Sequence, residues 1–297
     1  MLKDILPFWT TYGQYVVIGI LPYLVYCFFL KKFTNIAANR KNSNTENAQE
    51  EDENHENVLD EDTDEPVLPK DLKSIPFKYV RPSEGEMVQR SIEFYNIASA
   101  RRTLRFFSSD PVPPEVIHNI IRTAGMILET RTSPSGAHTE PWTFVVVSNT
   151  CTKERIREIV ELEEEINYKK RMSKKWVTDL KPLKTNWVKE YLTTAPYLIF
   201  VFKQTYGVLP DGKKKHHYYH ELSVSIACGI LITAIQYAGL VTLTSTPLNC
   251  GPALRTLLGR PSSEKLTLLL PVGYPANDAT VPALRRKPLD DILIEVN

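Results

Sequence analysis

The sequence predicts an α+β domain with three layers, α/β/α, around a central mixed sheet, and this domain is carried on an N-terminal membrane anchor. Three observations support that prediction. From residue 76 to residue 297, segments with helical periodicity alternate with short β-rich apolar runs. Residues 1–32 hold a long uncharged run, and residues 33–75 form a polar, acidic linker. A length of 297 residues suits one such domain with its appendages.

The N-terminal run predicts a single-pass transmembrane helix. Residues 7–30 carry no charged side chain, which is just enough for the roughly 20 apolar residues of a bilayer span. Lys31 and Lys32 follow the run and outweigh Lys3 before it, so the positive-inside rule places the rest of the chain in the cytoplasm. A cleaved signal peptide is the alternative, but no disulfide pattern of a secreted protein follows it.

The linker over residues 33–75 is expected to be a solvated spacer. Between Glu46 and Glu65 it holds eleven acidic residues and no basic one, a composition that cannot bury apolar surface. An acidic docking site for a reductase is the alternative interpretation. The net charge of the whole chain is only +1, which gives no indication of a nucleic-acid partner.

The elements of the domain follow from the spacing of apolar residues. Helices are expected over 86–100, 113–124, 152–172 and 221–237, and strands over 143–147, 197–202, 241–246 and 266–272. The first helix is expected to bury a stripe formed by Met87, Ile92, Tyr95 and Ala98. The 221–237 helix is almost wholly apolar and is expected to be buried on all sides.

Two motifs at the start of the domain are typical of a site for a phosphorylated flavin. The first is the basic cluster Arg101-Arg102-Thr103-Leu104-Arg105, whose guanidinium groups can hold a dianionic phosphate in forked hydrogen bonds. The second is the turn Pro134-Ser135-Gly136-Ala137, which can bring backbone N–H groups close to a flat ring. A solvated basic patch and a simple turn are the alternatives for each motif taken alone.

Several segments of the domain are more distinctive. They are PSGAHTEPW (134–142), EEINY (164–168), WVTDL (176–180), TNWVKEY (185–191), TPLNCGP (246–252) and RKPL (286–289). Together they resemble the iodotyrosine deiodinase family, which are membrane-anchored, FMN-dependent dehalogenases of the nitroreductase superfamily. The resemblance covers roughly residues 75–297, and the 161–191 segment resembles the lid that selects the substrate. One departure is the segment 126–131, which looks like an insertion and is either a lineage-specific bulge or a gene-model error.

The resemblance implies which residues bind FMN. The phosphate and ribityl chain would be held by the basic cluster, Arg101 to Arg105 with Thr103 and Leu104 between, and by Arg286 of the C-terminal arm. Ser135 would contact the cofactor, as would the group Thr244, Ser245 and Thr246, which is otherwise a polar strand end. The Thr246 hydroxyl would lie near flavin N5, where it favours one-electron steps over hydride transfer.

The resemblance also implies the substrate contacts. The backbone N–H of Ala137 would meet the phenolate oxygen, so that Ala137 and Thr246 are the catalytic groups. Glu164 would bind the ammonium group, Lys189 the carboxylate, and Tyr168 the carboxylate and the ring. His138 is read as structural, and 213–217 as a solvated loop without metal-ligand spacing.

The activity that the resemblance implies is reductive removal of iodide from mono- and diiodotyrosine, giving tyrosine. Other halotyrosines would fit as well. An external NADPH-dependent reductase would supply the electrons, since the chain has no G-x-G-x-x-G motif for a dinucleotide. A homodimer with swapped terminal arms is implied too. The alternatives are a generic NAD(P)H nitroreductase or quinone reductase and, in another class, a membrane-anchored adaptor without enzymatic activity.

Overall fold

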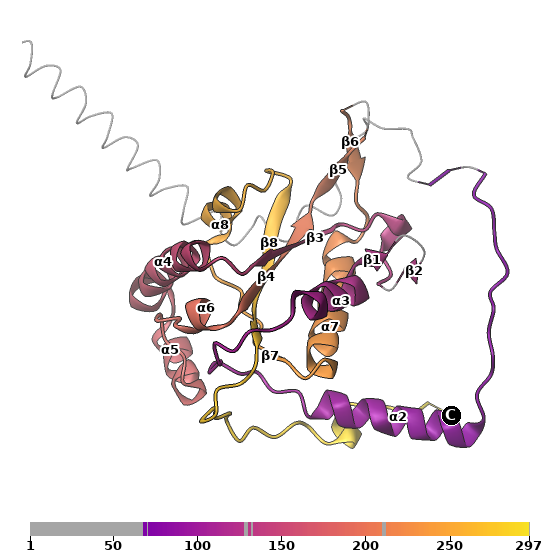
Figure 1. Ribbon diagram of the computed structural model, residues 1–297, viewed down its shortest axis with the longest axis horizontal. Coiled ribbons are helices and arrows are strands. Elements are labelled where there is room, and N and C mark those ends of the chain that lie inside the picture. Colours follow the sequence, from indigo (N-terminus) through magenta and orange to yellow (C-terminus); the bar gives the residue numbers. More distant parts are fainter. Residues whose placement is uncertain (1–67, 70, 128–129, 132, 210–211, 297) are drawn as a thin grey trace, which may run out of the picture. The chain divides into compact units, whose positions relative to one another are not determined.

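The computed structural model of the protein describes residues 68–69, 71–127, 130–131, 133–209 and 212–296. The chain divides into two units, Met1–Asp62 and Thr63–Asn297, and only the second contains described residues. The predicted membrane anchor and almost all of the predicted linker therefore lie outside the described residues. All that follows concerns the second unit (Figure 1).

A four-stranded sheet forms the centre of the domain. Its order is β3 (Trp142–Val147), β4 (Tyr197–Gln204), β8 (Glu264–Gly273) and β7 (Val241–Thr242), and each neighbouring pair is antiparallel. The prediction of a mixed sheet is wrong for these strands. Parallel pairing is limited to one bridge between Thr103 and Thr242, because the chain then leaves this edge and pairs with the residues after β8, where Ser108 N–H donates to the Tyr274 carbonyl.

Two helices cover one face of the sheet. They are α3 (Pro114–Ala124) and α7 (His220–Tyr237), and both pack against β4 and β8 (Figure 1). Helix α3 begins at a proline, which suits the first turn because its missing N–H would have no partner there. The predicted helix over 113–124 is confirmed, and its residues Ile117, Ile120 and Ala124 are buried against the sheet.

The other face is covered by α4 (Thr150–Ile166), α6 (Tyr191–Thr194) and α8 (Gly251–Leu257). Alternate residues of β4 point to the two faces, so that Phe200 and Phe202 join this second core whereas Ile199 and Val201 join the first. The strand is thus apolar on both sides, as the continuous run in the sequence indicates. These contacts confirm the three-layer arrangement.

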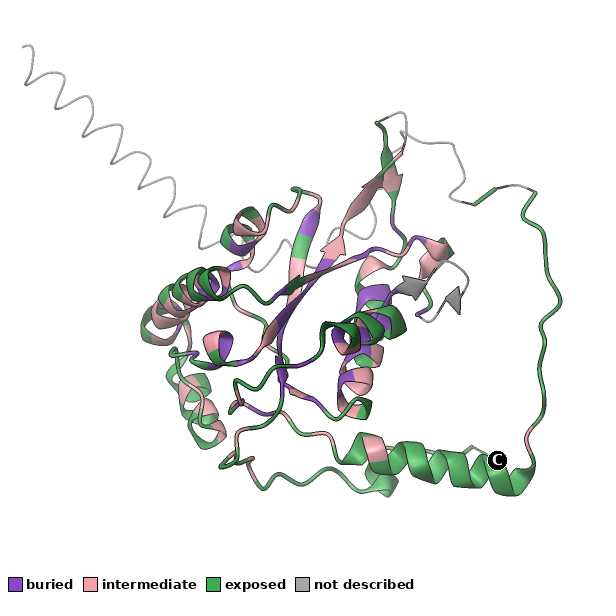
Figure 2. Cartoon of the chain, in the orientation of Figure 1, coloured by how far each residue is buried: buried purple, intermediate pink, exposed green. Residues whose placement is uncertain are grey.

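Two predictions of burial are wrong. Helix α2 (Glu84–Ser99) has no buried residue, and Met87, Ile92 and Tyr95 of its expected stripe are 49–69% exposed (Figure 2). Helix α7 buries only the face toward the sheet, while Leu222 and Ile226 are 62% and 46% exposed. In both cases the apolar pattern is present, but no other element among the described residues covers it.

Helix α7 also has a length and composition that would allow it to cross a membrane, and no other helix among the described residues does. However, Val224, Leu231 and Ile235 pack against the sheet, so α7 is a core helix of this domain.

The remaining elements lie at the ends of the sheet and after α4. They are β1 (Met126–Ile127), β2 (Thr130–Arg131), β5 (Tyr206–Val208), β6 (Lys214–His216), α5 (Lys174–Leu180) and the short helical turns Gly136–His138, Asn167–Arg171, Lys181–Leu183 and Leu289–Asp291. Strands β1 and β2, which belong to the apparent insertion, pair in antiparallel orientation. The solvated loop expected over 213–217 is partly wrong, because β6 pairs with β5 and His217 is buried with Nδ1 3.1 Å from the Gln204 carbonyl oxygen.

Candidate active site

The three residues expected to bind the substrate lie together in the segment between α4 and α6. Glu164 is on the last turn of α4, Tyr168 on the π-helical turn Asn167–Arg171, and Lys189 on the loop before α6. The Lys189 Nζ atom lies 3.3 Å from Glu164 Oε2 and 5.6 Å from the centre of the Tyr168 ring. An anion, a cation and an aromatic ring are thus brought to one place.

Lys189 and Glu164 form a nearly buried ion pair, with side chains only 7% and 13% exposed. Burial lowers the pKa of Lys189, and the Glu164 carboxylate opposes that shift only in part. The ammonium group also donates to the Thr185 hydroxyl at 3.4 Å and to the Asn186 carbonyl. Each charge therefore has a partner within the chain.

Tyr168 is held by an aromatic neighbour. Its ring meets Trp187 edge-on, with 6.0 Å between ring centres and 67° between planes. Burial raises the pKa of Tyr168, and a hydrogen bond with Thr185 opposes that shift. The phenol therefore stays protonated at neutral pH and can donate a hydrogen bond.

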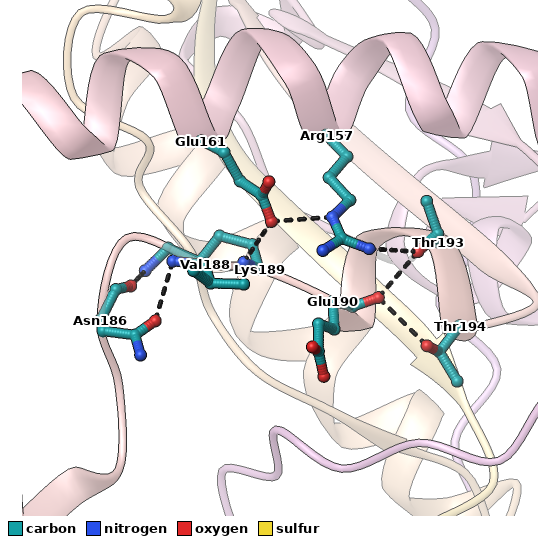
Figure 3. A network of polar contacts seen from close by, with 8 residues as sticks. All are labelled: Arg157, Glu161, Asn186, Val188, Lys189, Glu190, Thr193 and Thr194. Atoms are coloured by element: carbon teal, nitrogen blue, oxygen red, sulfur yellow. Dashed lines mark hydrogen bonds and ion pairs between the residues drawn. The ribbon is translucent and has the colours of Figure 1, made fainter.

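The backbone of Lys189 is fixed by a pair of residues on α4 (Figure 3). Glu161 Oε1 accepts from the Lys189 N–H and from Arg157 Nε, both at 2.7 Å, and Arg157 Nη1 reaches the Thr193 hydroxyl at 3.2 Å. The sequence interpretation did not single out Glu161. The available signal was Arg157, four residues earlier on the same face.

The turn before β3 has strained backbone. Ala137, His138 and Glu140 have φ angles of 46°, 56° and 49°, a region that non-glycine residues seldom adopt. Gly136 is required at its position, because an added Cβ would lie 2.5 Å from the Tyr218 carbonyl oxygen. Among the described residues none accepts a hydrogen bond from the Ala137 N–H, whereas the hydroxyl of Ser135 accepts from the Glu140 N–H at 3.1 Å.

The basic cluster lies beside the edge of the sheet. Leu104 is buried and its N–H donates to the Thr242 carbonyl at 3.2 Å, which leaves the side chains of Arg101 and Arg102 toward solvent. Arg102 donates to the Pro282 carbonyl of the C-terminal arm. Arg105 lies close enough to Tyr191, the last residue of the 161–191 segment, to affect its titration. Burial raises the pKa of Tyr191, and the positive charge of Arg105 opposes that rise in part.

A small cleft joins Arg105 to the lid and the arm. It has a volume of about 90 Å³ and is lined, among others, by Thr103, Arg105, Lys184 and Thr280. Lys184 Nζ lies 3.3 Å from the Thr280 hydroxyl across it. Two cations and two hydroxyls here make a surface suited to an anion.

The other residues predicted to bind FMN, at positions 244–246 and 286, make few contacts among the described residues. Ser245 is held by backbone hydrogen bonds in both directions with Leu269, at 3.1 and 2.9 Å, while Thr244 and Thr246 are exposed. Arg286 is exposed on the C-terminal arm, and no hydrogen bond or ion pair joins it to any residue that the structure describes. The described residues also contain no group of three or more His, Cys, Asp or Glu side chains placed to hold a metal ion.

Comparison with known protein families identifies the class of protein to which the chain belongs. Residues 98–274 match the Nitroreductase family, and the chain belongs to that family. Its relatives narrow the group further. It is 63% identical over 245 residues to the iodotyrosine deiodinase of Danio rerio, covering 82% of this chain and 79% of that one, and 61% identical over 238 residues to iodotyrosine deiodinase 1 of Homo sapiens, covering 80% of each. Within the nitroreductases, the chain therefore belongs with the iodotyrosine deiodinases.

One solved structure supports the same grouping. The crystal structure of oxidized iodotyrosine deiodinase bound to FMN and 3-iodo-L-tyrosine superimposes with a TM-score of 0.58 at 27% identity, covering 69% of this chain and 98% of that one. The relative from Hydra vulgaris, also named iodotyrosine deiodinase, is 63% identical over 221 residues, covering 74% of this chain and 79% of that one.

Proposed function

We propose that this protein is an FMN-dependent reductive dehalogenase that converts mono- and diiodotyrosine to tyrosine and iodide. The observation that carries the proposal is the meeting of Glu164, Tyr168 and Lys189 in one nearly buried place. A free amino acid needs an anion for its ammonium group, a cation for its carboxylate and an apolar surface for its ring. The identity of about 60% to iodotyrosine deiodinases supports the same substrate class.

The residues of the chain fit FMN in chemical type. Arg101 and Arg102 present guanidinium groups for a phosphate, and the hydroxyls of Ser135 and of the exposed Thr246 are suited to a flat, polar ring system. When bound, FMN supplies the electrons that cleave the carbon–iodine bond. The cleft beside Arg105, about 90 Å³, is well below the roughly 300–1,000 Å³ of ordinary cofactor pockets, which favours a cofactor site completed by a second copy.

Glu164 and Lys189 recognise the zwitterion by exchanging their mutual ion pair for bonds to the substrate. Because both side chains are nearly buried, a ligand that lacks either charge would leave one of them without a partner. Tyr168 covers the ring and donates to the carboxylate. The lid over 161–191 thereby excludes water from the reacting carbon.

The backbone N–H of Ala137 stabilises the phenolate oxygen, since it is a fixed donor with no acceptor among the described residues. The iodine-bearing carbon then receives one proton and two electrons, and iodide leaves. The electrons come in turn from a separate NADPH-dependent reductase. Thr246 contributes a hydroxyl donor on the cofactor side of the site.

A homodimer would complete the site. The apolar residues exposed on α2 and on the outer face of α7 are expected to pack against a second copy, and the exposed C-terminal arm would carry Arg286 to that copy's arginine cluster. The N-terminal run, by its length and flanking charges, would attach the dimer to a membrane with the catalytic domain in the cytoplasm.

Anaerobic titration tests the function. Purified protein is reduced chemically and titrated with 3-iodotyrosine while flavin absorbance and free iodide are followed. We expect oxidation of one flavin per iodide released. Protein that carries no flavin, or a reduced spectrum that halotyrosines leave unchanged, would contradict the proposal. Turnover of nitroaromatics with NADPH but not of iodotyrosine would select the generic nitroreductase instead.

A further inference from the structure

Asn167 lies between the lid and the loop that begins at Thr246, and its side chain is bonded on both sides. It is the first residue of the π-helical turn that follows α4 and is only 1% exposed. Its Nδ2 group donates to Glu164 Oε1 at 3.3 Å and to the Leu248 carbonyl at 3.2 Å. Its Oδ1 atom accepts from Arg171 Nη1 at 2.9 Å and from Asn249 Nδ2 at 3.2 Å.

The partners determine which way this amide points. A carboxylate and a carbonyl lie on one side and can only accept, so they require the NH₂ end. A guanidinium and a second amide NH₂ lie on the other side and require the oxygen. The reversed amide would place acceptor against acceptor and donor against donor in a buried position, so Asn167 has one stable orientation.

This arrangement fixes both oxygens of Glu164. Oε1 receives the hydrogen bond from Asn167, and Oε2 faces Lys189 at 3.3 Å. The same amide is bonded to Leu248 and Asn249, some 80 residues further along the chain and directly after Thr246. Asn249 itself has a φ of 63°, so the loop takes a tight left-handed turn to present its side chain.

We propose that Asn167 is a positioning residue that orients the Glu164 carboxylate for the substrate's ammonium group and ties it to the loop carrying Thr246. The inference rests on the proposed function, because it requires that Glu164 bind the ammonium group. Asn167 acts through Glu164 and the loop, without touching the substrate. The lid half and the cofactor half of the site then share one buried amide, and ordering of one half favours ordering of the other.

The test compares two ligands, because a general loss of structure would affect both alike. One is 3-iodotyrosine, and the other is 3-iodo-4-hydroxyphenylpropionate, which has no ammonium group. Dissociation constants for the flavin-loaded, full-length protein are measured by titration calorimetry. The dissociation constant of 3-iodo-4-hydroxyphenylpropionate divided by that of 3-iodotyrosine reports how much the ammonium group contributes to binding.

For Asn167→Ala we expect this ratio to fall about tenfold, the loss of one hydrogen bond to a charged group. The matched control is Asn149→Ala on the same helix. Asn149 caps the start of α4, with its Oδ1 accepting from the Thr152 N–H at 2.9 Å, and has no contact with Glu164. The control variant should lose thermal stability and keep the wild-type ratio.

A second variant changes Asn249, the residue of the 248–249 loop whose side chain donates to the Asn167 amide oxygen. Asn249→Gly removes one partner of Asn167, and glycine adopts the positive φ at this position without strain. We expect the ratio to fall about threefold, since Asn167 keeps its other partners. In a Glu164→Gln background, Asn167→Ala should change the ratio no further.

A wild-type ratio retained in both Asn167→Ala and Asn249→Gly would overturn the inference. A ratio near one in the wild-type protein is a different result, because it would remove Glu164 from ammonium binding and the proposed function would fall together with the role of Asn167. If Asn167→Ala does not fold, Asn249→Gly alone decides between the outcomes.

Discussion

The two halves of the proposed site differ in how much of each one chain can build. The lid half comes from one stretch, residues 161–191, and its charged and aromatic groups already meet in the single chain. The cofactor half comes from separate segments around residues 101–105, 135–137, 244–246 and 286, and it remains open, with Arg286 joined to none of the others by a hydrogen bond or ion pair among the described residues.

The difference teaches that the proposed substrate-binding and cofactor-binding groups have separate structural origins. The two ends of the 161–191 segment are held together because it continues directly from α4 and because Glu161 on α4 accepts a hydrogen bond from the Lys189 N–H (Figure 3). The segments of the proposed cofactor half adjoin α2, which ends just before Arg101, and α7, whose Ser223 accepts from the Gly136 N–H. The apolar residues exposed on these two helices are covered by no other described element (Figure 2). The proposed homodimer would therefore serve the cofactor half, whereas the lid half is assembled within one chain.

The largest expected effect comes from charged substitutions on the exposed apolar face of α7, which is proposed to pack against a second copy and complete the FMN site. Leu222→Glu combined with Ile226→Glu places two carboxylates on the outer face of α7. We expect a monomer whose affinity for FMN is lower by about a hundredfold or more, because an unpaired charge cannot be buried at an interface. Sedimentation gives the oligomeric state, and flavin absorbance per chain gives the occupancy.

The control for this prediction is Leu162→Glu. Leu162 is 63% exposed on α4, outside α2, α7 and the C-terminal arm, so the same chemical change should leave the mass and the FMN content unaltered. A dimer with full flavin content in the double variant would show that the outer face of α7 is not the interface.

The next effect concerns the lid half alone. Glu164→Gln keeps the shape of the side chain but removes the charge, and we expect 3-iodotyrosine to bind about 10 to 100 times more weakly with FMN content unchanged. Glu165→Gln is the matched control, because Glu165 is the next residue and pairs with Lys169 on the exposed face. Equal affinity in both variants would exclude Glu164 from the substrate site.

The smallest effect tests whether the Lys189 side chain is buried within one chain, without a second copy or a ligand. Burial lowers the pKa of Lys189 in the folded protein, whereas the unfolded chain keeps the ordinary value of 10.5. Between these two values the unfolded chain binds the proton and the folded protein does not, so this residue's contribution to stability rises with pH in that window and is constant below it.

Lys189→Met removes this contribution. The difference in unfolding free energy, wild type minus variant, should increase by up to about 1.4 kcal/mol per pH unit within the window. Urea denaturation at a series of alkaline pH values measures it, and Lys169→Met, an exposed lysine of the same segment, serves as control. A difference that does not change with pH would mean that the lid exposes Lys189 to water.

The three residues that the family resemblance predicts for the substrate lie close together in the structure, and helix spacing accounts for two of them. Glu164 and Tyr168 lie four residues apart, which places them on one face whether the turn is α-helical or, as observed, becomes π-helical at Asn167. Lys189 belongs to a distinctive motif. Asn167 stands in the same motif as Glu164, yet its role could not be predicted, because it depends on contacts with residues 248 and 249 far along the chain.

The sequence by itself determined the four main helices and the positions of the long strands β3, β4 and β8, the two-sided core of β4, and the residue types that are proposed to bind a zwitterion. Those properties depend on local periodicity and on motifs of a few residues. The tertiary structure alone decided that Glu161 bonds the backbone of Lys189, that Asn167 bonds both Glu164 and the 248–249 loop, and that no other described element covers the apolar faces of α2 and α7. An apolar stripe has the same pattern whether its own chain or another covers it, and a buried polar side chain gains its role only from the partners that folding brings to it.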